Sequence, residues 1–104
     1  MKQLSYKDFF ATLAADKRLD ILQYLHTNGA QNVSEISLGT GQEQSAVSHS
    51  LKKLLGCQCV HVEVRGKNRY YSLNSETIVP LLGLVDTHLK NYCHTSCQDC
   101  RDTA

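Results

Sequence analysis

Five cysteines are the residues whose chemistry stands out in this chain of 104 residues. They form a pair in the middle of the sequence and a group of three near its end, namely Cys57, Cys59, Cys93, Cys97 and Cys100. Thiolates suit soft ions such as Zn(II), Cd(II), Pb(II), Cu(I) or As(III) far better than they suit Mg(II) or Ca(II). The grouping therefore predicts a soft metal or metalloid site that is held by thiolates.

The last three cysteines are spaced i, i+4 and i+7, which places them on one face of a helix if the final helix continues that far. Three turns of one helix rarely converge on a single ion, so either the tail unwinds or Cys57 and Cys59 complete the ligand set. Two other interpretations stay open. The thiols can be small apolar packing residues, or a mid-chain thiol can form a redox-sensitive disulfide with a tail thiol.

The segment 42–55 has the pattern of a helix that presents a polar face to a nucleic acid. At helical period, Ala46, Val47, Leu51, Leu54 and Leu55 fall on one side and would face a core. The other side carries Gln44, Ser45, Ser48, His49, Lys52 and Lys53. Glutamine and serine can read base edges or bind phosphate, and lysine can neutralise phosphates. An ordinary surface helix would share this pattern, so the residues that follow must decide between the two interpretations.

After this segment the apolar period changes from that of a helix to that of a strand. Val60, Val62 and Val64 alternate with polar residues, which predicts a half-buried strand, and the segment 69–73 returns as a second strand. The turn between them, 65–68, contains glycine and asparagine, which tolerate positive φ. A β-hairpin is therefore expected directly after the polar-faced helix.

The tip of this hairpin is cationic, with Arg65, Lys67 and Arg69 close together. Such side chains can lie along a phosphate backbone or reach into the minor groove, as the wing of a DNA-binding domain does. A solvated hairpin of a protein-only interaction module would use the same residue types. The hairpin and the preceding helix together favour DNA binding.

The N-terminal part of the sequence predicts three further helices. The first spans about 4–15, the second follows with Asp16 as its cap, and a short third helix opens at the capping-box spacing of Asn32 and Glu35. The short helix, the turn 39–41 and the polar-faced helix make a helix-turn-helix. The last helix is expected to start near Val79.

The expected fold class is mainly α with a small β-hairpin, a winged helix-turn-helix in a single domain of residues 1–104. Within it, about 32–56 form the helix-turn-helix, 59–73 the wing and 93–104 a Cys-rich tail. The first and last helices, about 1–15 and 76–98, carry apolar stripes with Tyr6, Phe9, Phe10 and Leu13 on one and Leu81, Leu84, Val85, Leu89 and Tyr92 on the other. One small domain cannot readily bury both stripes, so we expect these helices to build a homodimer, which would match a palindromic double-stranded DNA operator.

Three runs of this sequence, 33–36, 44–54 and 65–73, resemble the ArsR/SmtB family of winged-helix repressors, and the resemblance covers about residues 5–92. It implies a homodimer that represses its operator and releases DNA when a metal ion, metalloid or oxidant alters the dimer. Some members that sense cadmium or lead pair a thiol near the end of the recognition helix with a tail thiol of the other protomer. Cys57 matches one such position, whereas Lys53 stands where a partner thiol would be. The arsenic-type thiol pair of the third helix is absent, because Ser34, Ile36 and Ser37 offer no soft ligand.

The same resemblance suggests an alternative zinc site on the last helix. Zinc-sensing relatives carry Asp-x-His followed by two further ligands, and Asp86 and His88 match the first half. The second half would fall on Asp99 and Asp102, two carboxylates in place of the usual ligands, so the match is incomplete.

Composition limits the remaining functions. The formal net charge is only +1, so the argument for DNA rests on local clustering of cations and not on an overall basic balance. No apolar run is long enough to span a bilayer and no signal-peptide pattern is present, so a cytoplasmic protein without a membrane partner is expected. The sequence offers no nucleophile with a base and no phosphate-cradling glycine loop, so we expect no enzymatic activity.

Overall fold

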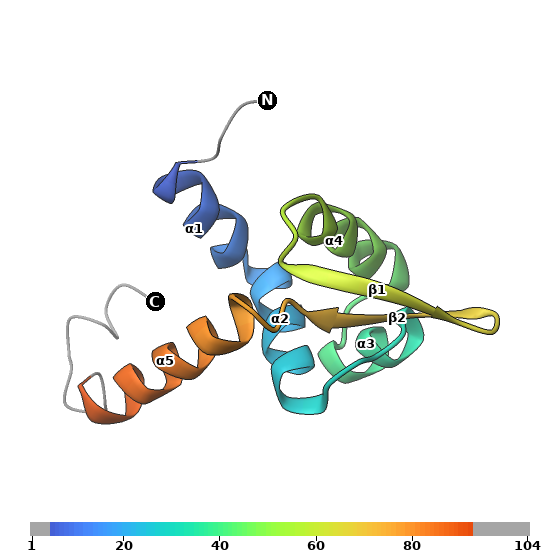
Figure 1. Cartoon of the computed structure of the whole chain (residues 1–104). Helices are drawn as coiled ribbons and strands as arrows, with labels where there is room; N and C mark the ends of the chain where they lie inside the picture. The colour runs from blue at the N-terminus through green and yellow to red at the C-terminus, as the bar shows by residue number, and fades with distance from the viewer. Residues whose placement is uncertain (1–4, 93–104) are drawn as a thin grey trace. The chain divides into compact units, whose positions relative to one another are not determined.

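A computed structural model of the chain describes residues 5–92 (Figure 1). The elements, in chain order, are α1 (Tyr6–Ala14), α2 (Asp16–Asn28), α3 (Val33–Thr40), α4 (Gln44–Gly56), β1 (Val60–Arg65), β2 (Asn68–Leu73) and α5 (Ile78–Asn91). The chain divides into two compact units, one ending at Asn74 and one beginning at Ser75. The predicted fold class, mainly helical with a two-stranded hairpin, is confirmed.

Local sequence signals explain most helix ends in the first unit. Asn32 and Glu35 form the predicted capping box of α3, with Asn32 Oδ1 accepting from the Glu35 amide at 2.8 Å and the Glu35 carboxylate accepting from the Asn32 amide at 2.9 Å. The expected cap of α2 is wrong. Ala15 occupies the N-cap position, and Asp16 is the first helical residue, where its carboxylate still interacts favourably with the helix dipole.

Four helices and the hairpin contribute to the core of the first unit. The apolar side chains buried there are Leu13, Ile21, Leu22, Leu25, Ile36, Val47, Leu51, Leu54, Cys59, Val60, Tyr71 and Leu73. They come mainly from α2, from the core-facing side of α4, and from the ends of the two strands that are farthest from the turn. This core fixes α4 and the hairpin relative to each other, since both elements contribute to it.

The hairpin pairs its strands in antiparallel register, with Val60 opposite Leu73 and Arg65 opposite Asn68. The loop is therefore the two residues Gly66 and Lys67, of which only Gly66 has positive φ, at 61°. The predicted half-buried strand is wrong beyond its first residue, because only Val60 of β1 is buried. Figure 1 shows the hairpin extending beyond α4, and Val62 and Val64 are 41% and 66% exposed.

A short bridge ties β2 to the loop between α2 and α3. The Gln31 amide donates to the Tyr71 carbonyl at 3.0 Å, and the Tyr71 amide donates back to the Gln31 carbonyl at 2.8 Å. The Tyr24 hydroxyl of α2 also donates to Gln31 Oε1 at 3.1 Å. Backbone pairing thus holds β2 to the loop before α3, and the Tyr24 side chain of α2 holds Gln31 of that loop.

In the second unit, α5 begins at Ile78, within one residue of the expected start near Val79, and Pro80 is its third residue. A proline is tolerated in the first turn because its missing amide would have no helical partner there. Leu84 and Leu89 are 68% and 50% exposed in the single chain. None of the helices in residues 5–92 has the length and apolar character needed to cross a membrane.

Candidate nucleic-acid interface and thiol positions

The polar face of α4 is open to solvent, as the sequence predicted. Val47, Leu51 and Leu54 bury one side of the helix in the core, while Ala46 and Leu55 are half-buried at its margins. The exposed residues are Gln44, Ser45, Ser48, His49, Lys52 and Lys53. The helix therefore presents amides and hydroxyls in its first turns and ammonium groups further along.

Side chains fix the angle between the two helices of the helix-turn-helix. The Ser37 hydroxyl of α3 donates to the Gln42 carbonyl at 2.5 Å, and Gln42 Nε2 donates to the Lys17 carbonyl of α2 at 3.0 Å. Gln44, the first residue of α4, donates through Nε2 to the Ser34 hydroxyl of α3 at 3.4 Å. The exposed start of α4 thus lies beside the start of α3.

The tip of the hairpin lies against the same end of α3. A polar hollow, which we call the wing hollow, is lined by Asn32, Val33, Ser34, Lys67, Asn68, Arg69 and Tyr71. Ser34 is common to the wing hollow and to the contact with Gln44. The structure therefore brings the start of the recognition helix and two wing cations to one region of the surface through a residue of α3.

Arg65, the third predicted wing cation, is engaged within the hairpin itself. Its Nε donates to Glu63 Oε1, and its guanidinium carbon lies 5.1 Å from the centre of the Tyr70 ring. The hydrogen bond with Glu63 raises the pKa of the Arg65 guanidinium. Arg65 is therefore charged and exposed but already paired with a carboxylate.

The two mid-chain thiols have different environments. Cys57 is the C-cap residue of α4 and is half-buried, whereas Cys59 is buried in the core with 1% of its surface exposed. Burial, and to a smaller extent the neighbouring Cys57 thiol, raises the pKa of the Cys59 thiol. Because a metal ligand must be a thiolate, Cys57 suits ligation and Cys59 suits packing.

The remaining predicted ligands are not brought together among the residues that the structure describes. Cys93, Cys97, Cys100, Asp99 and Asp102 lie outside this range. Asp86 and His88 are exposed on α5, where the His88 ring lies 5.2 Å from the Tyr92 ring. Within residues 5–92, no group of three or more His, Cys, Asp or Glu side chains could hold an ion.

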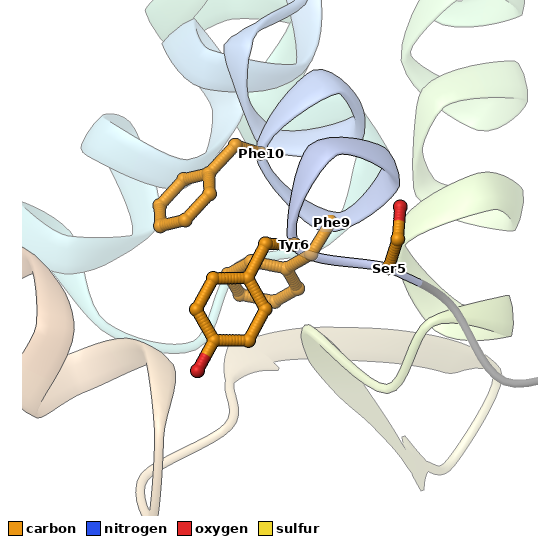
Figure 2. A pocket seen from close by; sticks show the side chains of 4 residues that line it. All are labelled: Ser5, Tyr6, Phe9 and Phe10. Atoms are coloured by element: carbon orange, nitrogen blue, oxygen red, sulfur yellow. The ribbon is translucent and has the colours of Figure 1, made fainter.

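An apolar hollow also opens on α1, between its N-cap Ser5 and the rings of Tyr6, Phe9 and Phe10 (Figure 2). The Phe9 and Phe10 rings meet edge to face with their centres 5.3 Å apart. Tyr6 and Phe10 are 88% and 53% exposed, so this helix leaves aromatic surface in contact with water.

Comparison with known proteins decides the family. Residues 15–61, which cover α2, α3, α4 and the start of β1, match the model of the "Bacterial regulatory protein, arsR family". The chain is 35% identical over 77 residues to the arsenical resistance operon repressor of Bacillus subtilis, and the match covers 74% of this chain and 73% of that protein. The chain belongs to the ArsR family.

Solved structures agree with an ArsR-family winged helix-turn-helix. A homodimeric winged helix-turn-helix DNA-binding domain from Mycobacterium bovis superposes with a TM-score of 0.69 at 27% identity, over 90% of this chain and 98% of that domain. The transcriptional repressor PagR of Bacillus anthracis gives a TM-score of 0.68 at 29% identity, over 76% and 90% of the two chains. ArsR-family proteins are DNA-binding transcriptional regulators, so the chain is a regulator and not an enzyme.

Sequence reasoning missed several residues of this ArsR-family surface. The sequence predicts Asn32 only as part of a capping box and Ser34 only as a position without a soft ligand, and their place beside the wing follows from tertiary packing. For Glu63 and Tyr70 the sequence predicts no more than a position on one of the two strands. The period-2 alternation places Glu63 and Arg65 on one face of the strand, which is the signal that could have suggested their pairing.

Proposed function

We propose that this ArsR-family protein is a homodimeric repressor that binds a palindromic operator through α4 and the wing, and that leaves DNA when thiolates bind a soft metal or metalloid ion. The observation that carries the DNA-binding part is the position of Ser34. This residue contacts the start of α4 and also lines the wing hollow, so the groove-reading helix and the phosphate-binding cations belong to one surface.

Within this surface the residues have different roles. Gln44, Ser45, Ser48 and His49 lie in the first turns of α4 and can reach base edges in the major groove. Lys52, Lys67 and Arg69 neutralise phosphates and position the protein without reading sequence. Glutamine at position 44 is partly restrained by Ser34, which limits the conformations in which it can approach a base.

Salt dependence of DNA binding tests this assignment. An operator selected from a pool of random duplexes is labelled, and its affinity is measured by fluorescence anisotropy at several salt concentrations. The double variant Lys67→Gln/Arg69→Gln should reduce the log–log slope by about 3.6, because it removes two phosphate contacts from each protomer of the dimer and each lost contact contributes about 0.9. Lys7→Gln, which removes one exposed cation from α1, is the control and should leave the slope unchanged. Duplex binding that does not weaken with salt would contradict DNA recognition by this surface.

The dimer rests on exposed apolar surface in the first and last helices. Tyr6 and Phe10 of α1 and Leu84 and Leu89 of α5 are each at least half exposed in the single chain, and the Mycobacterium bovis relative is homodimeric. Leu84→Glu/Leu89→Glu should therefore yield a folded monomer in sedimentation experiments. Leu38→Glu is the matched control, since Leu38 is 88% exposed but lies on α3. A dimer that survives the α5 variant would remove this helix from the interface.

The ion site is proposed to combine Cys57 with Cys93, Cys97 and Cys100. The relative from Bacillus subtilis is a repressor of an arsenical resistance operon, and Cys57 is the half-exposed thiol at the end of the recognition helix. A thiolate there can couple ion binding to the position of α4 on DNA, which gives the two states that an effector needs. The ion is one of the soft ions that thiolates prefer, namely Cd(II), Pb(II), Zn(II), Cu(I) or As(III).

Titration of the reduced protein with Cd(II) and with arsenite tests the ion site. Sulfur-to-metal absorption should report three or four thiolates for each ion, and the ion should weaken operator binding. Cys57→Ser should lose part of this response, whereas Cys59→Val should keep it. A response to oxidant only, with no ion bound under reducing conditions, would favour the disulfide mechanism. Zinc binding that survives removal of all tail thiols would instead favour Asp86 and His88.

A further inference from the structure

The two arginines of the wing point to opposite faces of the hairpin. In an antiparallel pair, residues directly opposite each other share a face, and successive residues along a strand alternate. Arg69 is opposite Val64 and therefore shares the face of Val60 and Tyr71, which is the face that packs on the core. Arg65 shares the other face with Glu63 and Tyr70.

On this outer face, Arg65 has two partners. Glu63 lies two residues away on the same strand and accepts the Nε–H of Arg65, while the Tyr70 ring, opposite Glu63, lies below the guanidinium at 5.1 Å. Lys67 and Arg69 line the wing hollow, and among residues 5–92 neither makes an ion pair or a ring contact. The wing thus holds one paired cation on its outer face and two unpaired cations near α3.

This difference matters because non-specific affinity for DNA is almost entirely electrostatic. Each cation that neutralises a phosphate releases counterions and adds affinity for any duplex, whatever its sequence. A cation already paired with a carboxylate has its charge largely neutralised, so it attracts phosphate and releases counterions less than an unpaired cation does. Pairing therefore lowers affinity for operator and random DNA by about the same factor, because phosphate contacts carry no sequence information, and it leaves the base-reading residues of α4 unchanged.

We propose that Glu63 and Tyr70 withhold Arg65 from the DNA backbone, so that the wing contacts phosphates through Lys67 and Arg69 and Glu63 limits the strength and the salt dependence of binding to any duplex. This inference rests on the proposed DNA-binding function and assigns Glu63 a positioning role within it. The sequence predicts Arg65 as a DNA-contacting residue. In this proposal Arg65 binds phosphate only when the charge of Glu63 is removed.

A double-mutant cycle on Glu63 and Arg65 tests the proposal. The affinity of the wild type, Glu63→Gln, Arg65→Gln and the double variant is measured for the selected operator and for a random duplex of equal length, between 50 and 200 mM salt. Arg65→Gln alone should leave the log–log slope nearly unchanged. Because the dimer has two wings, Glu63→Gln should steepen it by about 1.8, which corresponds to about a 12-fold larger loss of affinity over that salt range. Glu63→Gln/Arg65→Gln should return to the wild-type slope.

The outcomes separate this role from simpler ones. If Arg65→Gln lowers the slope by about 1.8 in the otherwise wild-type protein, Arg65 already binds phosphate in both protomers and the proposal is overturned. If the double variant keeps the steeper slope of Glu63→Gln, the carboxylate acts by plain repulsion of DNA and not through Arg65, which also overturns it. Asp20→Asn removes the same charge from the exposed surface of α2 and should match the wild type. A wild-type protein that binds no duplex would refute the proposed function itself, which is a distinct result.

Discussion

Replacing Gly39 of α3 by alanine should destabilise the protein, although alanine is the better helix former. A Cβ atom at this position would lie within the van der Waals radii of the Tyr24 ring, with ring atoms Cζ and Cδ1 at 2.5 and 2.8 Å. The ring cannot move freely, because the Tyr24 hydroxyl is bonded to Gln31 and Gln31 is paired with Tyr71 of the hairpin. Relief of the clash must therefore shift either α3 or the part of β2 that pairs with Gln31.

The magnitudes decide the sign of this effect. Overpacking of a fixed neighbour costs about 1–3 kcal/mol, whereas exchanging glycine for alanine in a helix gains at most about 1 kcal/mol and less near a helix end. We expect a net loss of about 1 kcal/mol, which lowers Tm by about 4–8 °C in a domain of this size. Thermal unfolding is followed by circular dichroism at one fixed protein concentration, because dimerisation makes Tm depend on concentration.

Gly56→Ala is the matched control for this prediction. Gly56 is the last residue of α4, and a Cβ atom there would meet nothing within 4 Å, so the exchange should raise Tm slightly. A cycle with Tyr24→Ala should show that the penalty at Gly39 disappears when the ring is absent. A Gly39→Ala protein that is as stable as Gly56→Ala would refute the packing of Tyr24 on α3.

Three further changes have expected outcomes. Asn32→Ala removes the side-chain cap of α3 and should cost about 1 kcal/mol in chemical unfolding, while Asn32→Ser should keep most of the stability. Cys59→Ser buries a hydroxyl in place of a thiol and should cost about 1–3 kcal/mol, more than Cys59→Val does. Burial raises the pKa of the Cys59 thiol, so the folded state favours the neutral thiol. The stability of the fold should therefore fall as pH rises above the pKa of an unfolded thiol, about 8.5, and it should fall less in Cys59→Val, which has no thiol at this position. Arg18→Met removes the 2.7 Å hydrogen bond from Nε to the Thr12 carbonyl at the end of α1 and should increase amide hydrogen exchange in that helix, an effect that Arg18→Lys should not reproduce in full.

Local sequence rules predicted the helices and the hairpin turn because their causes lie within a few residues. The capping box at Asn32 and Glu35, the glycine of the wing loop and the apolar face of α4 each depend on neighbours three or four positions away. The same rules failed for the cap of α2. Asp16 and Ala15 are adjacent, and a shift of one residue at a helix start lies within the usual uncertainty of boundaries.

Tertiary contacts decided what the sequence could not predict. The alternation of valines in β1 predicts one apolar face, but whether that face is covered depends on tertiary packing, and here Val62 and Val64 are exposed. The two mid-chain thiols differ for a similar reason. Between them, Gln58 adopts a left-handed backbone with φ of 57°, and the chain then directs Cys59 into the core while Cys57 stays half-exposed.

The left-handed corner at Gln58 has one more consequence, which concerns how a signal would reach the DNA-binding unit. Asn74 donates its side-chain amide to the Gln58 carbonyl and its backbone amide to the Cys59 carbonyl, both at 2.9 Å. Asn74 is also the final residue of the first unit, so everything that follows it is tethered to the rest of the chain at this point. These two hydrogen bonds hold the chain at the end of β2 beside the loop that joins α4 to β1. A displacement of the chain at Asn74 would therefore act on both of these segments together, while α4 and the first residues of the hairpin stay packed in the core.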